Sequence, residues 1–184
     1  GADGALLPYF VVVAGTEVED AARSLAGYRR VLSARFSDGA FFFAEDQKRP
    51  LIDRLEDLAA VRFHRDLGSV RDKVERFSRL AFRLASELAE PLGLSAPLAP
   101  PADPLAVAVE GKDGFAGQLA RASALTKADL TTQMVYEFPE LQGVMGAEYA
   151  RRGGEPEAIA RAIAEHYLPR GADDDLPSEP LGAL

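Results

Sequence analysis

Apolar residues recur at helical spacing along most of the chain after residue 20. The clearest pattern runs from about Ser69 to Glu90, where apolar positions repeat every three or four residues and so share one side of a helix. Ser69 is a typical N-cap residue, and Asp72 can complete a box-like start. The stripe predicted to face the core consists of Val70, Val74, Phe77, Leu80, Ala81, Leu84, Ala85 and Leu88.

Shorter segments show a similar pattern. Gly39 weakens the prediction of a helix over residues 29–47, because glycine disfavours a helix interior. Pro50 and Pro156 suit the first turns of two others, where proline is tolerated. These predicted helices cover residues 29–47, 51–61, 115–128, 130–136, 139–152 and 156–167, so the sequence predicts a mainly α fold.

One segment near the N-terminus has the pattern of a strand. Leu6 to Val13 is rich in β-branched and aromatic residues and is followed by Ala14-Gly15. A lone strand cannot complete its own hydrogen-bond ladder, so we expect its partners in a preceding domain. We therefore assign residues 1–18 to the tail of a preceding β-containing domain, and residues 19–184 to a helical domain truncated at its C-terminal end. The chain is interpreted as a piece of a larger polypeptide.

Residues 91–112 interrupt the helical pattern. Five of the chain's twelve prolines lie within fourteen residues, at Pro91, Pro97, Pro100, Pro101 and Pro104. We expect a Pro-rich loop over this range.

Composition narrows the class of protein. The 184 residues fit one domain, and a hydrophobic fraction of 47% allows a packed core. The absence of cysteine excludes disulfides and thiolate metal sites. No apolar run approaches the roughly 18 residues needed to span a bilayer. We expect a cytoplasmic protein that does not enter a membrane.

Charge is unevenly distributed. The net charge of −8 argues against strong non-specific binding to nucleic acid. Residues 23–83, however, hold 14 Lys or Arg against 9 Asp or Glu, a net +5. If RNA contacts the chain, this segment is the favoured place, and an ordinary mixed-charge surface is the alternative.

Several stretches occur in an order and spacing that resemble a known family, the bacterial glycyl-tRNA synthetase β subunit. The longest is Met134-Val-Tyr-Glu-Phe-Pro-Glu-Leu-Gln-Gly-Val-Met-Gly146, and a phrase of this length seldom arises by chance. The resemblance spans about four-fifths of the chain, although the Pro-rich loop is longer than the family leads us to expect. The other stretches are Arg35–Phe43 with Asp46, Phe63–Ser69 with Asp72-Lys73, Lys127–Leu130, Tyr149-Ala150, Gly154-Glu155, Glu165–Tyr167 and Asp174–Pro177.

The resemblance implies a role within a two-subunit ligase that joins glycine to its tRNA using ATP. Glycine activation belongs to the α subunit, and the β subunit mainly engages tRNA. The matched region is the HD-like helical domain, named for its similarity to metal-dependent HD phosphohydrolases. The implied partners are the α subunit, tRNA(Gly) and other domains of the β subunit, with no cofactor bound in this region.

HD hydrolases hold a divalent ion with separated histidines, an adjacent His-Asp pair and a later aspartate. Where the pair would fall, this chain reads Lys127-Ala128-Asp129. Ala128 cannot ligate a metal, and Lys127 would repel one. The two histidines, His64 and His166, lie far apart in sequence. We therefore expect neither a metal nor a catalytic residue, with Ala128 and Asp129 as a degenerate HD position.

Basic residues on one helix face are the candidate contacts with RNA or another subunit. Arg76, Arg79 and Arg83 follow Asp72 at helical spacing, so they form a stripe beside the apolar one. Arginine suits phosphate contacts, but an ordinary solvated face with an Asp72–Arg76 pair is the alternative. The full candidate set is Arg29, Arg30, Arg35, Lys73, Arg76, Arg79 and Arg83.

Three functions remain open at this point. The first is a non-catalytic scaffold that supports tRNA. The second is a residual metal-dependent phosphohydrolase, which requires bound metal and turnover that depends on Asp129. The third is a spacer that contacts only protein. The sequence favours the first.

Overall fold

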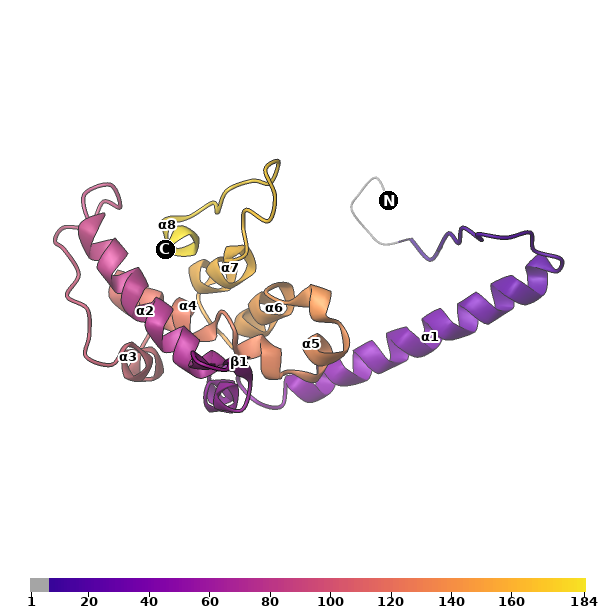
Figure 1. The fold of residues 1–184 in the computed structure, drawn as a ribbon, viewed down its shortest axis with the longest axis horizontal. Coiled ribbons are helices and arrows are strands. Elements are labelled where there is room, and N and C mark those ends of the chain that lie inside the picture. Colours follow the sequence, from indigo (N-terminus) through magenta and orange to yellow (C-terminus); the bar gives the residue numbers. More distant parts are fainter. Residues whose placement is uncertain (1–6) are drawn as a thin grey trace. The chain divides into compact units, whose positions relative to one another are not determined.

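The computed structural model describes residues 7–184, which are mainly helical, as the sequence predicts (Figure 1). The chain forms two compact units, Gly1–Ala40 and Phe41–Leu184. The boundary at residue 18 and the HD-like topology stay predictions. Within residues 7–184, no helix combines the length and apolar character that crossing a membrane requires.

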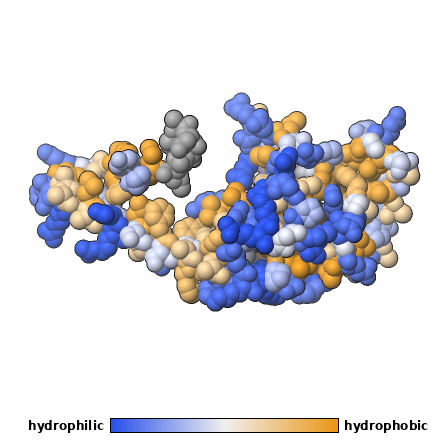
Figure 2. All heavy atoms as spheres, turned by 180° about the vertical axis from the view of Figure 1, so that it is seen from behind, coloured by the Kyte–Doolittle hydropathy of each residue, from blue (hydrophilic) through white to orange (hydrophobic). Residues whose placement is uncertain are grey.

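The first unit contains most of helix α1 (Ala21–Asp46). The helix begins where the helical pattern begins, after residue 20, and earlier than the segment predicted over residues 29–47. Asp20 Oδ1 accepts a hydrogen bond from the backbone N–H of Arg23 at 2.9 Å and so stabilises its first turn. Hydrophobic and hydrophilic side chains are intermixed on its surface in Figure 2. The exposed apolar residues of this part of α1 include Leu25, Tyr28, Val31 and Phe36.

The strand predicted for Leu6 to Val13 is wrong for the residues that the structure describes. Leu6 lies outside them, and residues 7–14 form no strand. Val11 and Val13 are each 91% exposed. Within residues 7–184, nothing pairs with this segment, and β propensity without a neighbouring strand does not make a sheet.

The second unit is built from short helices and one small antiparallel pair of strands, which the residue pattern did not predict (Figure 1). Two 3-10 helices replace the single helix predicted over residues 51–61. In chain order the elements are η1 (Leu51–Arg54), η2 (Glu56–Ala59), β1 (Arg62–His64), β2 (Gly68–Ser69), α2 (Val70–Glu87), α3 (Pro104–Glu110), α4 (Gly114–Leu125), η3 (Ala128–Thr131), α5 (Gln133–Glu137), η4 (Pro139–Leu141), α6 (Val144–Arg152), α7 (Glu157–Glu165) and α8 (Pro180–Ala183).

The prediction of a Pro-rich loop over residues 91–112 is partly wrong, because this range contains α3. Asp103 Oδ1 accepts hydrogen bonds from the backbone N–H groups of Leu105 and Ala106, at 2.9 and 3.1 Å. Pro104 occupies the first turn, where its missing N–H costs nothing. Proline therefore starts a helix here instead of breaking one.

Helix α2 begins as predicted. The Ser69 hydroxyl accepts from the backbone N–H of Asp72 at 3.2 Å, and the Asp72 carboxylate accepts from the backbone N–H of Ser69 at 2.7 Å. This reciprocal capping box satisfies two backbone donors that a helix start otherwise leaves unpaired.

The core lies where α4 packs against α2, α3 and α7. Most of the predicted α2 stripe faces it, but Leu80 is 54% exposed and Leu88 is 43% exposed, so these two predictions are wrong. Phe82, which the stripe omits, is buried instead. Because α2 packs against both α3 and α4, its buried face includes Ser78 and Phe82 and turns away from Leu80.

A buried carboxylate joins the end of α1 to the rest of the second unit. Asp46 is 2% exposed. Its Oδ2 accepts from the backbone N–H of Met134 at 2.9 Å and from the Tyr149 hydroxyl at 3.0 Å, and its Oδ1 accepts from the backbone N–H of Gln133 at 2.9 Å. Arg54 Nη2 lies 3.4 Å from Oδ1. One side chain thereby connects α1, η1, α5 and α6.

Replacing Asp46 tests this connection. Asp46→Asn keeps the shape of the side chain but places an N–H donor among other donors. We expect the free energy of unfolding to fall by about 3 kcal/mol, measured by urea denaturation. Asp38→Asn makes the same change at an exposed position of α1 and should leave stability almost unchanged. Equal stability of the two variants would contradict the role given to Asp46.

Candidate functional site

The residues predicted to form a degenerate HD position, Ala128 and Asp129, lie inside the second unit, at η3. Ala128 is fully buried and Asp129 is 1% exposed. Asp129 Oδ2 accepts hydrogen bonds from the backbone N–H of Gly143 at 2.7 Å and of Gly146 at 3.2 Å, at the start of α6. A Cβ on Gly146 would lie 2.9 Å from the same oxygen. The Asp129 carboxylate therefore caps the start of α6.

Burial raises the pKa of Asp129 above its usual range, against the lowering effect of the Gly143 and Gly146 amides and of the Lys127 charge. The amides and the nearby cation supply the opposite polarity that a desolvated carboxylate needs.

Lys127 and His166 form a polar pair beside this cap. His166 Nδ1 lies 2.6 Å from the Ile163 carbonyl oxygen, and its Nε2 lies 2.8 Å from Lys127 Nζ. Because the carbonyl can only accept and the ammonium can only donate, the imidazole is neutral, with its proton on Nδ1. The Lys127 ammonium also stands 3.7 Å from the centre of the Tyr167 ring, within cation–π range.

The pKa values of this pair agree with that assignment. Burial, with the Lys127 charge, lowers the pKa of His166 to about 4. Burial, with the charge of Lys73, lowers the pKa of Lys127 to about 8. Both shifts disfavour the charged form of a group that has moved out of water.

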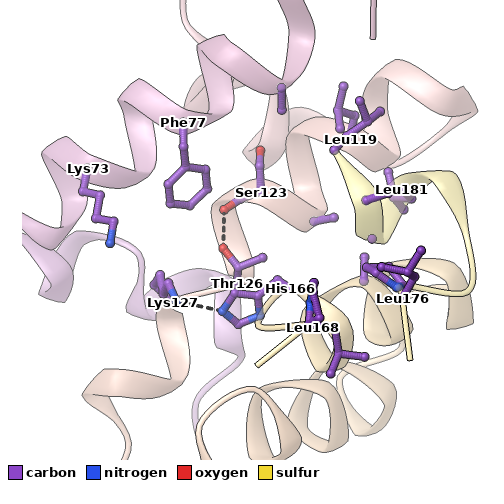
Figure 3. Close-up of a pocket in the computed structure, with 18 residues that line it drawn as sticks. Lys73, Phe77, Leu119, Ser123, Thr126, Lys127, His166, Leu168, Leu176 and Leu181 are labelled. Carbon is purple, nitrogen blue, oxygen red and sulfur yellow. Dashed lines mark hydrogen bonds between the residues drawn. The ribbon is translucent and has the colours of Figure 1, made fainter. Parts of the chain in front are cut away.

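A cavity of about 610 Å³ opens on one side of the pair (Figure 3). Figure 3 shows Lys73 and Phe77 on α2 across from Lys127 and His166. Apart from a few polar groups, the walls are apolar. The apolar residues that line them are Phe77, Ala81, Leu119, Ala122, Ala162, Leu168, Pro169, Leu176, Pro177, Leu181, Ala183 and Leu184.

The structure does not bring the two histidines to one site. His64 is exposed on β1, and its Nδ1 accepts from the backbone N–H of Asp66 at 3.2 Å. His166 is partly buried at the end of α7. Within residues 7–184, no group of three or more His, Cys, Asp or Glu residues is close enough together to hold a metal ion.

The candidate arginines of α2 are largely balanced by neighbouring acids. Arg79 pairs with Glu75 at 2.8 Å, and Arg83 pairs with Glu87 at 3.0 Å. The Asp72 carboxylate, which the alternative reading paired with Arg76, is engaged by Ser69 in the capping box. The Arg76 charge still helps to lower the pKa of Asp72, after the larger effect of the Ser69 hydrogen bonds.

The remaining candidates lie in other settings. Lys73 Nζ sits 4.2 Å from the centre of the Phe63 ring and reaches the cavity. Arg29, Arg30 and Arg35 are exposed on α1, within the first unit. A contact of any of these residues with RNA or another subunit stays a prediction.

Sequence reasoning did not predict the hydrogen bonds that the buried polar residues of the second unit form. Asp46, Asp129 and Tyr149 belong to the stretches that carry the family resemblance, but no local pattern shows that they are buried hydrogen-bonding partners. The pairing of Lys127 with His166 joins residues 39 positions apart. The one available signal was that each of these residues falls within a resembling stretch.

Comparison with known proteins gives one family. The model described as "Glycyl-tRNA synthetase beta subunit" matches residues 1–184. The glycine–tRNA ligase beta subunit of Myxococcus xanthus (strain DK1622) is 52% identical over 181 residues, which are 98% of the chain and 23% of that protein. Those of Trichlorobacter lovleyi and Trichodesmium erythraeum are each 45% identical over 182 residues, 99% of the chain and 23% and 22% of the relatives. The chain thus spans under a quarter of these relatives.

The pH dependence of the free energy of unfolding tests whether the His166 imidazole is neutral in the folded protein. The unfolded imidazole binds a proton with a pKa near 6.5, but the folded one only near 4. Unfolding therefore takes up a proton between these values, and stability is lost as pH falls through the window. Between pH 7 and pH 5 we expect this group to remove about 2 kcal/mol of unfolding free energy.

Urea denaturation at a series of pH values measures this loss. His166→Gln should flatten the profile between pH 7 and pH 5, because the titrating group is gone. His64→Gln removes an exposed imidazole and should keep the slope. An unchanged slope in His166→Gln would rule out the buried neutral imidazole.

Proposed function

Because the chain belongs to the glycyl-tRNA synthetase β subunit family, we propose that it forms a non-catalytic part of a glycine–tRNA ligase that supports tRNA and other domains. The whole enzyme joins glycine to its tRNA using ATP, and an α subunit activates glycine. The implied partners are that α subunit, tRNA(Gly) and the other domains of the β subunit, in the cytoplasm.

The use of Asp129 as a helix cap carries the non-catalytic part of the proposal. Its Oδ2 already accepts two backbone hydrogen bonds, and Gly146 packs against it. The residue before it is an alanine, and the residue before that is a lysine held by His166. A divalent ion at this place would face a cation and compete with backbone amides. The residues present favour a structural role over hydrolysis.

The exposed arginines of α1 and α2 support the tRNA part of the proposal. Phosphate binding needs accessible guanidinium groups, and Arg76 is exposed and forms no ion pair within residues 7–184. Arg79 and Arg83 would exchange their glutamate partners for phosphate, which costs little because exposed pairs are weak. A moderate, salt-dependent contact fits this surface better than tight binding.

The division of labour predicts that this chain alone does not activate glycine. Glycine-dependent ATP–pyrophosphate exchange should stay at background for the chain, and should appear when an α subunit is added to the complete β subunit. Exchange by the chain without an α subunit would contradict the proposed role. Omission of glycine provides the blank for each measurement.

Salt titration tests the tRNA contact. In the complete β subunit, Arg76→Ala with Arg79→Ala should weaken binding of tRNA(Gly) and reduce the slope of log affinity against log salt by about 1 to 2. The control pair, Arg151→Ala with Arg152→Ala, removes the same charge from α6, where both arginines pair with glutamates. No effect of the α2 pair would favour a role in protein contacts alone, and equal effects of the two pairs would show that the contact is not specific to α2.

A further inference from the structure

The cavity beside Lys127 has the features of a small-molecule site. Its volume of about 610 Å³ lies within the range of known ligand pockets, and a few polar groups converge on an otherwise apolar wall. We propose that it binds a small amphipathic anion, with a single anionic head at Lys73 and Lys127 and an aliphatic tail along the apolar walls. This assignment does not depend on the tRNA role proposed above.

Lys127 supplies the first half of the head site. An ammonium group has three donors, and one of them is used by His166 Nε2 at 2.8 Å. The neighbouring carboxylate of Asp129 is turned to the start of α6. Within residues 7–184, Lys127 forms no ion pair with a carboxylate. A partly buried cation in this state gains from an anion that enters the cavity.

Lys73 supplies the second half from the opposite wall. It projects from α2, and Figure 3 shows its amine directed toward the side of the cavity where Lys127 and His166 lie. Burial lowers the pKa of both Lys127 and His166, and the charge of Lys73 adds to this effect. It forms no ion pair within residues 7–184 and rests on the Phe63 ring at 4.2 Å. One anion between the two amines relieves their repulsion.

The tail site is a preformed apolar surface. Phe77 on α2 and Leu119 on α4 face Leu176 and Leu181 of the C-terminal segment in Figure 3. That segment is held in place, because Glu165 accepts hydrogen bonds from the backbone N–H and the hydroxyl of Ser178, both at 2.8 Å. The walls therefore do not need to assemble around a ligand.

The combination of two lysines and apolar walls favours some classes of ligand over others. A purely apolar molecule would leave two lysines desolvated without an anionic partner, and a cation would be repelled by their charge. A bulky multiply charged ligand would place charge against leucine and phenylalanine. A single charge at one end of an aliphatic chain satisfies both halves of the lining.

Calorimetric titration of decanoate into the complete β subunit measures its affinity and tests the proposal. We expect binding to strengthen about fourfold for each added methylene between octanoate and decanoate, because each buries apolar surface. Decanol, which lacks the charge, should bind at least about tenfold more weakly. Decyl phosphate in place of decanoate decides which anionic head the amines prefer.

Two substitutions and a control locate the head. Lys127→Met and Lys73→Met keep an apolar stem and remove the charge, and each should weaken decanoate binding about tenfold or more without changing that of decanol. Lys73→Met alters a residue that is only partly buried, so it serves even if Lys127→Met disturbs the fold. Lys48→Met removes a charge from an exposed lysine outside the cavity and should have no effect.

The proposal is overturned by any of three results. The first is the absence of binding by octanoate, decanoate and decyl phosphate. The second is equal affinity for decanol and decanoate, which would show an apolar groove without a head site. The third is decanoate binding that neither lysine substitution weakens.

Discussion

The second unit depends on a charge that is held out of water. Asp46 keeps a carboxylate almost fully buried, and such a group is tolerated only when hydrogen-bond donors surround it. Here the donors come from Arg54, Tyr149 and the backbone at the start of α5. The elements must therefore meet in one arrangement, because another packing would leave Asp46 or Arg54 buried without a partner. Apolar contacts supply most of the burial, and this carboxylate specifies which surfaces meet.

Asp129 is a second buried carboxylate that is surrounded by hydrogen-bond donors, and its surroundings affect what it can bind. A buried carboxylate can bind a metal or can bind backbone N–H groups, and its neighbours decide between them. Alanine at position 128, a lysine at position 127 and the amides of Gly143 and Gly146 all favour the second use. The cavity beside Lys127 is lined by two lysines, a few other polar groups and mainly apolar side chains. The charged groups of its lining are cations, whereas the charged ligands of a metal centre are anions.

Local patterns predicted the features that depend on near neighbours. The start of α2 follows from Ser69 and Asp72, which are three residues apart, and most of its buried face follows from helical spacing. The exposed Leu80 and the buried Phe82 depend on where α3 and α4 pack, which spacing along one helix does not contain. The strand predicted near the N-terminus failed because a strand needs a partner. The hydrogen bond from Tyr149 to Asp46 joins residues 103 positions apart, so no short pattern announces it.

Helix α6 has a start that it cannot stabilise by itself. Its N-cap position is Gly143, whose φ of 79° forms the turn but whose missing side chain provides no acceptor. Asp129 supplies that acceptor from outside the helix. A helix of nine residues is too short to persist alone, so α6 acquires its first turn only as η3 docks beside it. The two segments should therefore fold and unfold together as one cooperative unit.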